Sequence, residues 1–176
     1  MIWVQTYTGI RFDLEHPTCE MVDIEDIAHA LAYQCRFTGH SLFHYSIAQH
    51  SVLVSQKCLP TQRLEGLLHD AAEAYIGDVN APLKSLLPDY QCVERRIHQV
   101  VAWRFGLPDE LSPEVKVVDA RMCLTEKRTL FKDALDWEVP FEPYPDSDVY
   151  IAPWTMETAE RAFLREFYRL KGENDG

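Results

Sequence analysis

Apolar residues recur at intervals of three and four through most of the chain, and this helical spacing is the feature that most limits its fold. In segment 24–35, for example, Ile24, Ile27 and Leu31 would share one face of a helix that Asp23 can cap. Comparable stripes predict five more long helices and one short one, over 47–57, 62–75, 90–105, 114–131, 156–170 and, for the short helix, 83–87. The predicted fold class is mainly α.

Two segments depart from the helical pattern. Near the start, Trp3 to Tyr7 and Ile10 to Phe12 flank the turn dipeptide Thr8-Gly9, which predicts a short β-hairpin. Segment 137–153 contains four prolines and several aromatic residues, and a long ordered loop is expected there. The length of 176 residues fits one domain over 1–176, with the C-terminal loop and helix 137–171 packing on the rest.

Composition excludes several classes of protein. The formal net charge of -11 would repel a nucleic-acid backbone, so binding of a duplex is not expected. The five cysteines form no CxxC pair, which argues against a disulfide framework and a zinc ribbon. No apolar run is long enough for a membrane span and the N-terminus does not resemble a signal peptide, so we expect a cytoplasmic protein that does not enter a membrane.

A histidine-aspartate pair stands inside the helix predicted over 62–75. His69 and Asp70 directly follow the apolar pair Leu67-Leu68. Aspartate is rarely buried without a partner, because an unpaired charge in an apolar setting is costly. Adjacent helical residues point about 100° apart, so both side chains can reach one point between them. A metal ion at that point would stabilise the carboxylate.

Two other predicted helices carry a matching polar residue within an apolar stripe, namely His50 and Asp119. Each alone is more often a hydrogen-bonded core residue, and only the joint pattern favours a shared site. Two imidazoles and two carboxylates suit a divalent ion such as manganese, cobalt, iron, zinc or magnesium better than calcium. We therefore predict a metal site formed by His50, His69, Asp70 and Asp119.

The segments that contain these residues resemble the three metal motifs of the HD superfamily of metal-dependent phosphohydrolases. They are Tyr45 to Ser51, Leu67 to Glu73 and Val115 to Asp119, in the order H…HD…D, with 19 residues from His50 to His69 and 49 from Asp70 to Asp119. The resemblance covers about residues 25 to 130. More closely, the chain resembles the bacterial 5′-deoxynucleotidases of that superfamily and their phage and alphaproteobacterial relatives.

The resemblance also implies catalytic residues. Glu73 lies four residues after His69, on the same helical face, where it could act as general acid or base. The members that this chain resembles have a catalytic glutamate at this place. Gly77 to Lys84 resembles the stretch that follows the HD helix, where Asp78 would lie near the attacking water or the sugar and Lys84 near phosphate. A solvated glutamate, a capping aspartate and a surface lysine are the structural alternatives.

Further substrate contacts are implied at Arg36 and Phe37, 14 residues before His50. In the deoxynucleotidases an arginine there holds phosphate, and the adjacent aromatic residue, usually tryptophan, selects against a 2′-hydroxyl. Phe37 departs from that pattern and lacks the indole donor, which puts selectivity for deoxyribose in doubt. Lys116 is a further candidate for phosphate binding, and His44 is a reserve metal ligand.

The expected activity is release of phosphate from (deoxy)nucleoside 5′-monophosphates by a homo-oligomer, a dimer or larger. Removal of triphosphate from nucleoside triphosphates and cleavage of phosphodiesters would use the same metal site and stay open. A di-iron oxygenase would need extra histidines, for which only His40 and His44 are spare. A non-catalytic nucleotide-binding protein is a further alternative.

Overall fold

The computed structural model describes residues 2–133 and 135–172. Its chain begins with a hairpin of strands β1 (Trp3–Gln5) and β2 (Arg11–Asp13), which are antiparallel with Val4 opposite Phe12. Thr8, at the tip, donates hydrogen bonds from its backbone nitrogen and its hydroxyl to the buried carboxylate of Asp26, which ties the hairpin to the first helix. The predicted hairpin is confirmed.

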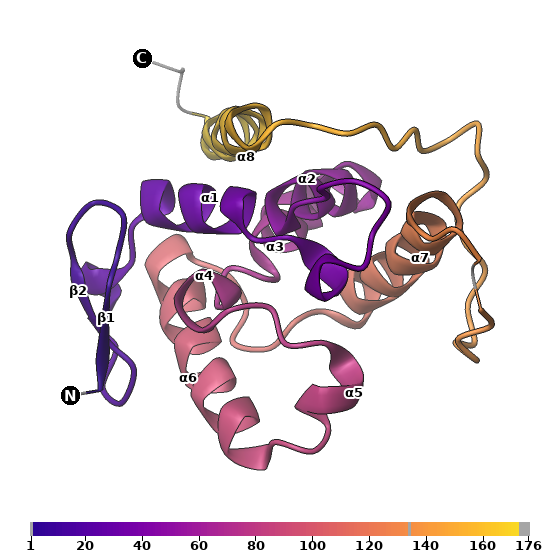
Figure 1. Ribbon diagram of the computed structural model, residues 1–176. Coiled ribbons are helices and arrows are strands. Elements are labelled where there is room, and N and C mark those ends of the chain that lie inside the picture. The colour runs from indigo at the N-terminus through magenta and orange to yellow at the C-terminus, as the bar shows by residue number, and fades with distance from the viewer. Residues whose placement is uncertain (1, 134, 173–176) are drawn as a thin grey trace.

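The rest of the described chain is helical or loop, which confirms the mainly α fold class (Figure 1). Its helices are α1 (Ile24–Tyr33), α2 (Ile47–Lys57), α3 (Arg63–Leu68), α4 (Glu73–Ile76), α5 (Ala81–Lys84), α6 (Pro88–Phe105), α7 (Pro113–Leu130) and α8 (Met156–Lys171). Single 3₁₀ turns are η1 (Cys19–Met21), η2 (Arg36–Gly39) and η3 (Pro60–Gln62). No helix or strand interrupts the predicted proline-rich loop over 137–153.

Capping residues explain where three of these helices begin. The side chains of Asp23, Ser46 and Thr155 accept hydrogen bonds from backbone N–H groups in the first turns of α1, α2 and α8. Such bonds satisfy amide donors that have no partner within the helix. The caps agree with the sequence-based starts of these helices.

The helix predicted over 62–75 is not continuous. It is divided into α3 and α4 by a turn over 69–72, which contains His69 and Asp70. Within and beside this turn the hydrogen bonds close over three residues, from Ala71 N to Leu68 O and from Glu73 N to Asp70 O. Such bonds tighten the chain to about three residues per turn. Apolar spacing could not predict this break, because the buried face persists through it.

Two groups of buried apolar side chains form the core. The larger lies among α1, α2, α3, α6 and α8 and includes Leu31, Ile97 and Phe163. The smaller lies among α2, α7 and the loop before α8 and includes Val54 and Met122. Figure 1 shows α8 lying across α1 and α2, which it contacts. Helix α2 therefore lies between the two groups.

Within residues 2–133 and 135–172, no helix combines the length and the apolar character that crossing a membrane requires.

The contact between α8 and the larger core group gives a first testable prediction. Phe163 has no exposed surface, so Phe163→Ala should lower the free energy of unfolding by about 3–5 kcal/mol through lost burial and the cavity left behind. Urea denaturation followed by circular dichroism measures this loss. The exposed Arg165→Ala on the same helix is the control, with a change within about 0.5 kcal/mol. Equal losses would contradict the assigned packing of α8.

Candidate metal centre

Three segments bring the four predicted ligands together. His50 comes from α2, His69 and Asp70 from the turn between α3 and α4, and Asp119 from α7. The Nε2 atom of His50 lies 3.0 Å from Asp119 Oδ1 and 3.7 Å from Asp70 Oδ2. The Nε2 atom of His69 lies 3.2 Å from Asp70 Oδ2 and 3.7 Å from Asp119 Oδ1. The sequence-based ligand set therefore forms one cluster.

The hydrogen bonds of the two imidazoles leave both Nε2 atoms without a proton when the rings are neutral. Nδ1 of His69 is 2.8 Å from the carbonyl oxygen of Gly66, and Nδ1 of His50 is 2.5 Å from a carboxylate oxygen of Glu126. Carbonyl and carboxylate oxygens accept, so each Nδ1 donates. The Nε2 atoms of the two neutral rings would then lie 3.3 Å apart with their lone pairs facing each other, beside two carboxylates. This arrangement needs a proton or a cation between the rings.

A divalent ion fits three of the four predicted ligands, His50, His69 and Asp119, while Asp70 lies beside this group and is not part of it. Bonds of about 2.0–2.2 Å from an ion to nitrogen and oxygen ligands separate adjacent ligand atoms by roughly 3.0–3.5 Å. The distances within the cluster run from 3.0 to 3.7 Å. His50, His69 and Asp119 each offer one atom within 4.8 Å of the others, and they could hold a metal ion. The side chain of Asp119 is 39% exposed, so the cluster opens toward solvent on that side.

Protons and a metal ion would compete for the same two nitrogen atoms. Burial opposes a charge on either ring, but the surrounding carboxylates outweigh it and raise the pKa of His50 and, more strongly, of His69. Burial likewise opposes ionisation of Asp70 and Asp119, yet the adjacent imidazoles lower the pKa of both carboxyl groups. The cluster therefore keeps its carboxylates charged and attracts positive charge to its centre.

A second group of buried polar side chains supports the ligands. Glu126 on α7 has no exposed surface, and its Oε1 accepts hydrogen bonds from His50 Nδ1 and, at 2.7 Å, from the hydroxyl of Tyr45. Arg36 lies between two carboxylates, with Nη1 3.3 Å from Asp70 Oδ2 and Nε 3.4 Å from Glu126 Oε2. The sequence reading missed Glu126 and Tyr45. Glu126 follows Asp119 by seven residues, two helical turns on the same face, which was the available signal.

Glu73 and Lys84 lie together beside the cluster. Lys84 Nζ is 3.6 Å from Glu73 Oε1 and 2.5 Å from Glu94 Oε1. Burial, with Asp70 and Asp78 nearby, raises the pKa of Glu73 to about 9. Burial also raises the pKa of Asp78. A buried carboxyl group with a raised pKa and a lysine side chain thus lie next to the predicted ligands.

Three other predicted residues lie differently. Phe37 packs against Phe131 and Trp137, with ring centroids 5.3 and 5.9 Å away, in an aromatic group beside Arg36. Lys116 is exposed on α7, and within the described chain its side chain forms no ion pair with the cluster. His44 Nε2 lies 3.3 Å from the carbonyl of Ala32 and belongs to no metal-holding group among the described residues.

Comparison with known proteins identifies relatives of this chain. It is 38% identical over 172 residues to the uncharacterized protein YfdR of Escherichia coli (strain K12), across 97% of this chain and 96% of YfdR. The chain belongs to the YfdR family. It is also 37% identical over 124 residues to an uncharacterized protein of Rhodobacter capsulatus, across 65% of this chain and 63% of that protein. No family model matches the sequence. The resemblance to the HD superfamily therefore stays a prediction.

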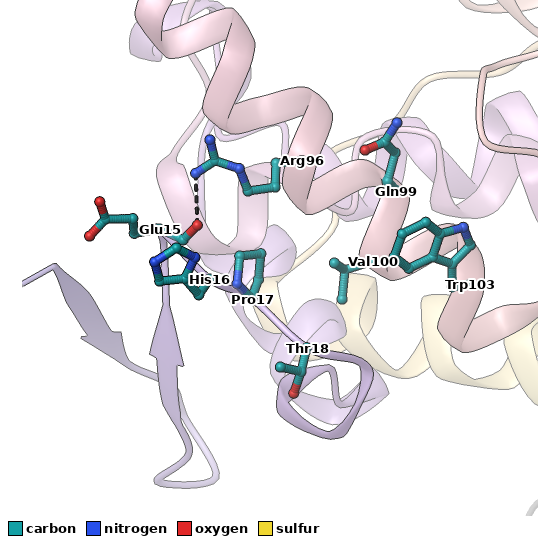
Figure 2. Close-up of a pocket in the computed structure, with 8 residues that line it drawn as sticks. All are labelled: Glu15, His16, Pro17, Thr18, Arg96, Gln99, Val100 and Trp103. Carbon is teal, nitrogen blue, oxygen red and sulfur yellow. Dashed lines mark hydrogen bonds between the residues drawn. The ribbon is translucent and has the colours of Figure 1, made fainter.

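A surface depression of about 490 Å³ lies away from this cluster, between the segment after β2 and helix α6 (Figure 2). Its lining includes His16, Arg96 and Trp103. Arg96 donates to the backbone carbonyl of Glu15 at 2.9 Å and so closes one side of the depression. None of the predicted site residues lines it.

Because protons and a metal ion would compete for the same nitrogen atoms, stabilisation of the protein by metal should depend on pH. Because the folded-state pKa values of His50 and His69 are raised, protonation stabilises the folded protein below the ordinary histidine pKa, and this contribution is lost as the pH rises through the raised values. Mn²⁺ must displace these protons. At one fixed Mn²⁺ concentration, the increase in melting temperature should therefore be larger at about pH 8.5 than at about pH 6.

Differential scanning fluorimetry with and without Mn²⁺ measures this increase at each pH. The Asp119→Asn variant should lose most of the increase at both values, since one charged ligand is gone. An increase that does not depend on pH, or that survives in Asp119→Asn, would contradict the assigned ligands.

Proposed function

We propose that this protein is a metal-dependent phosphohydrolase that releases phosphate from (deoxy)nucleoside 5′-monophosphates. The observation that carries the proposal is the geometry of the cluster, in which the Nε2 atoms of His50 and His69 lie 3.3 Å apart beside two carboxylates, with the buried carboxyl group of Glu73 close by. A divalent ion held by His50, His69, Asp70 and Asp119 would supply Lewis-acid activation of a phosphate oxygen and of a water molecule.

Hydrolysis of a phosphate monoester needs proton transfer at two oxygen atoms. A bond forms between phosphorus and the water oxygen, the bond between phosphorus and the ester oxygen breaks, and the leaving oxygen takes up a proton. The protonated carboxyl group of Glu73 can donate that proton. Asp78, whose pKa is also raised, would accept a proton from the attacking water.

Positive side chains can offset the charge of the phosphate oxygens. Lys84 is one such side chain, since its ammonium group is partly exposed next to Glu73. Arg36 is the other, although its Nη1 and Nε atoms lie near Asp70 and Glu126. Two positive side chains can offset the charge of a phosphate monoester. A triphosphate carries more negative charge and would need more of them. Removal of triphosphate remains the second candidate through the same ligands.

The substrate claim gives a direct prediction. Phosphate release from a panel of ribo- and deoxynucleoside mono- and triphosphates should favour the 5′-monophosphates when Mn²⁺ or Co²⁺ is present, and chelation should abolish it. Asp70→Asn should lower the rate by at least about 10²-fold, because it removes a charged ligand and leaves the fold intact. The readout is inorganic phosphate, with chromatography of the nucleotide products.

The same panel separates the alternatives. Release of intact triphosphate would make the protein a triphosphohydrolase. Nucleotide binding without turnover by any metal-loaded sample would overturn the hydrolase proposal and favour a non-catalytic binding protein.

Glu73 provides a prediction on the proton-transfer step. Glu73→Gln keeps the shape of the side chain but cannot deliver a proton, so kcat should fall by roughly 10²–10⁴-fold. Calorimetric titration should give nearly unchanged Mn²⁺ affinity, since Glu73 is not one of the predicted ligands. The exposed Glu157→Gln on α8 is the matched control and should retain wild-type kcat. An unchanged kcat in Glu73→Gln would remove this residue from the mechanism.

A further inference from the structure

Glu126 is a buried charged residue on α7 whose contacts are with other polar side chains. Its side chain has no exposed surface and reaches from α7 to His50 on α2. A buried ion pair is often no more stabilising than apolar residues of similar size, because both charges lose their hydration. The polar partners of Glu126 therefore indicate what the carboxylate does in this place.

The contacts of Glu126 lead to the ligands of the proposed metal centre. Oε1 accepts the Nδ1 proton of His50 at 2.5 Å, which leaves Nε2 of that ring directed at Asp119 and His69. Oε2 is 3.4 Å from Arg36, whose Nη1 lies beside Asp70. One carboxylate thus contacts one ligand directly and a second through an arginine.

Tyr45 holds the carboxylate in turn. It has no exposed surface, and its hydroxyl donates to the same Oε1 atom at 2.7 Å. The hydroxyl group of a buried tyrosine needs an acceptor, and Glu126 satisfies it. Rotation of the carboxylate would leave the buried hydroxyl of Tyr45 and Nδ1 of His50 without an acceptor, and it would move the charge away from its ion pair with Arg36.

We propose that Glu126 is a positioning residue, which holds His50 in the tautomer with the proton on Nδ1 and directs Nε2 at the metal ion. A carboxylate on the far nitrogen of a ligating histidine fixes the ring and increases its donor strength. The inference rests on the metal centre of the proposed function, and it assigns Tyr45 and Arg36 as the groups that keep Glu126 in place.

The test compares metal affinity in Glu126→Gln and in a matched control. Glutamine has nearly the same shape, but it has no charge and adds an amide donor beside Arg36 and His50. The control is Asp26→Asn, which alters another buried carboxylate. That carboxylate accepts two hydrogen bonds from Thr8, which is not one of the proposed ligands. Calorimetric titration with Zn²⁺ and Mn²⁺ should give about 10–100-fold weaker binding for Glu126→Gln and unchanged binding for Asp26→Asn.

A spectroscopic readout separates positioning from stability. In the zinc-loaded wild type, the ¹⁵N signals of His50 should show a protonated Nδ1 and a metal-bound Nε2. In Glu126→Gln the zinc-induced shift of Nε2 should be reduced or absent. Tyr45→Phe, which removes one hydrogen bond to Glu126, should weaken binding in the same direction by several-fold, and it replaces Glu126→Gln if that variant does not fold.

Each outcome decides one claim. Wild-type affinity and unchanged His50 signals in Glu126→Gln, or in Tyr45→Phe where the first does not fold, would overturn the positioning role. Equal losses in Asp26→Asn would overturn it as well, since the effect would then reflect stability. A wild type that binds neither metal overturns both proposals. A wild type that binds metal but hydrolyses no nucleotide overturns the proposed activity, whereas weaker binding by Glu126→Gln still supports the positioning role.

Discussion

Helix α2 lies between the two groups of core side chains, and the site depends on its burial. Because His50 has no exposed surface, water cannot satisfy its ring nitrogens, and each needs a partner inside the protein. Glu126 takes the proton of Nδ1, and Nε2 faces His69 and Asp119. The packing that buries α2 therefore determines which atom of His50 is offered to a cation.

Charge links this site to the rest of the molecule. The chain has a formal net charge of -11, and the cluster itself contains two carboxylates. An anionic substrate approaching such a protein needs a local positive centre. A divalent ion, with Lys84 and Arg36 beside it, would provide one at the place where Asp70 and Asp119 leave the cluster partly open.

The segment after α1 is held in a costly conformation near this opening. Phe37 and Thr38 have φ values of 55° and 54°, in the left-handed region that side chains other than glycine rarely adopt. The aromatic contact of Phe37 with Phe131 and the hydrogen bond from Asn80 Nδ2 to Thr38 Oγ1, at 3.4 Å, hold this conformation. Since Arg36 precedes these residues, the strained turn also sets where its guanidinium group lies.

Local patterns in the sequence predicted most of the helices and drew attention to the four proposed ligands. Apolar spacing and caps such as Ser46 depend on residues a few positions apart, and His50 and Asp119 stood out as polar residues within apolar stripes.

Periodicity shows which face of a helix is buried, but not which buried faces meet. Glu126 lies 76 residues from His50 and 81 from Tyr45, so only the packing of α7 against α2 could bring them together. Only the tertiary structure showed the break between α3 and α4 at His69. The apolar spacing continues through the turn, so the sequence pattern does not reveal it.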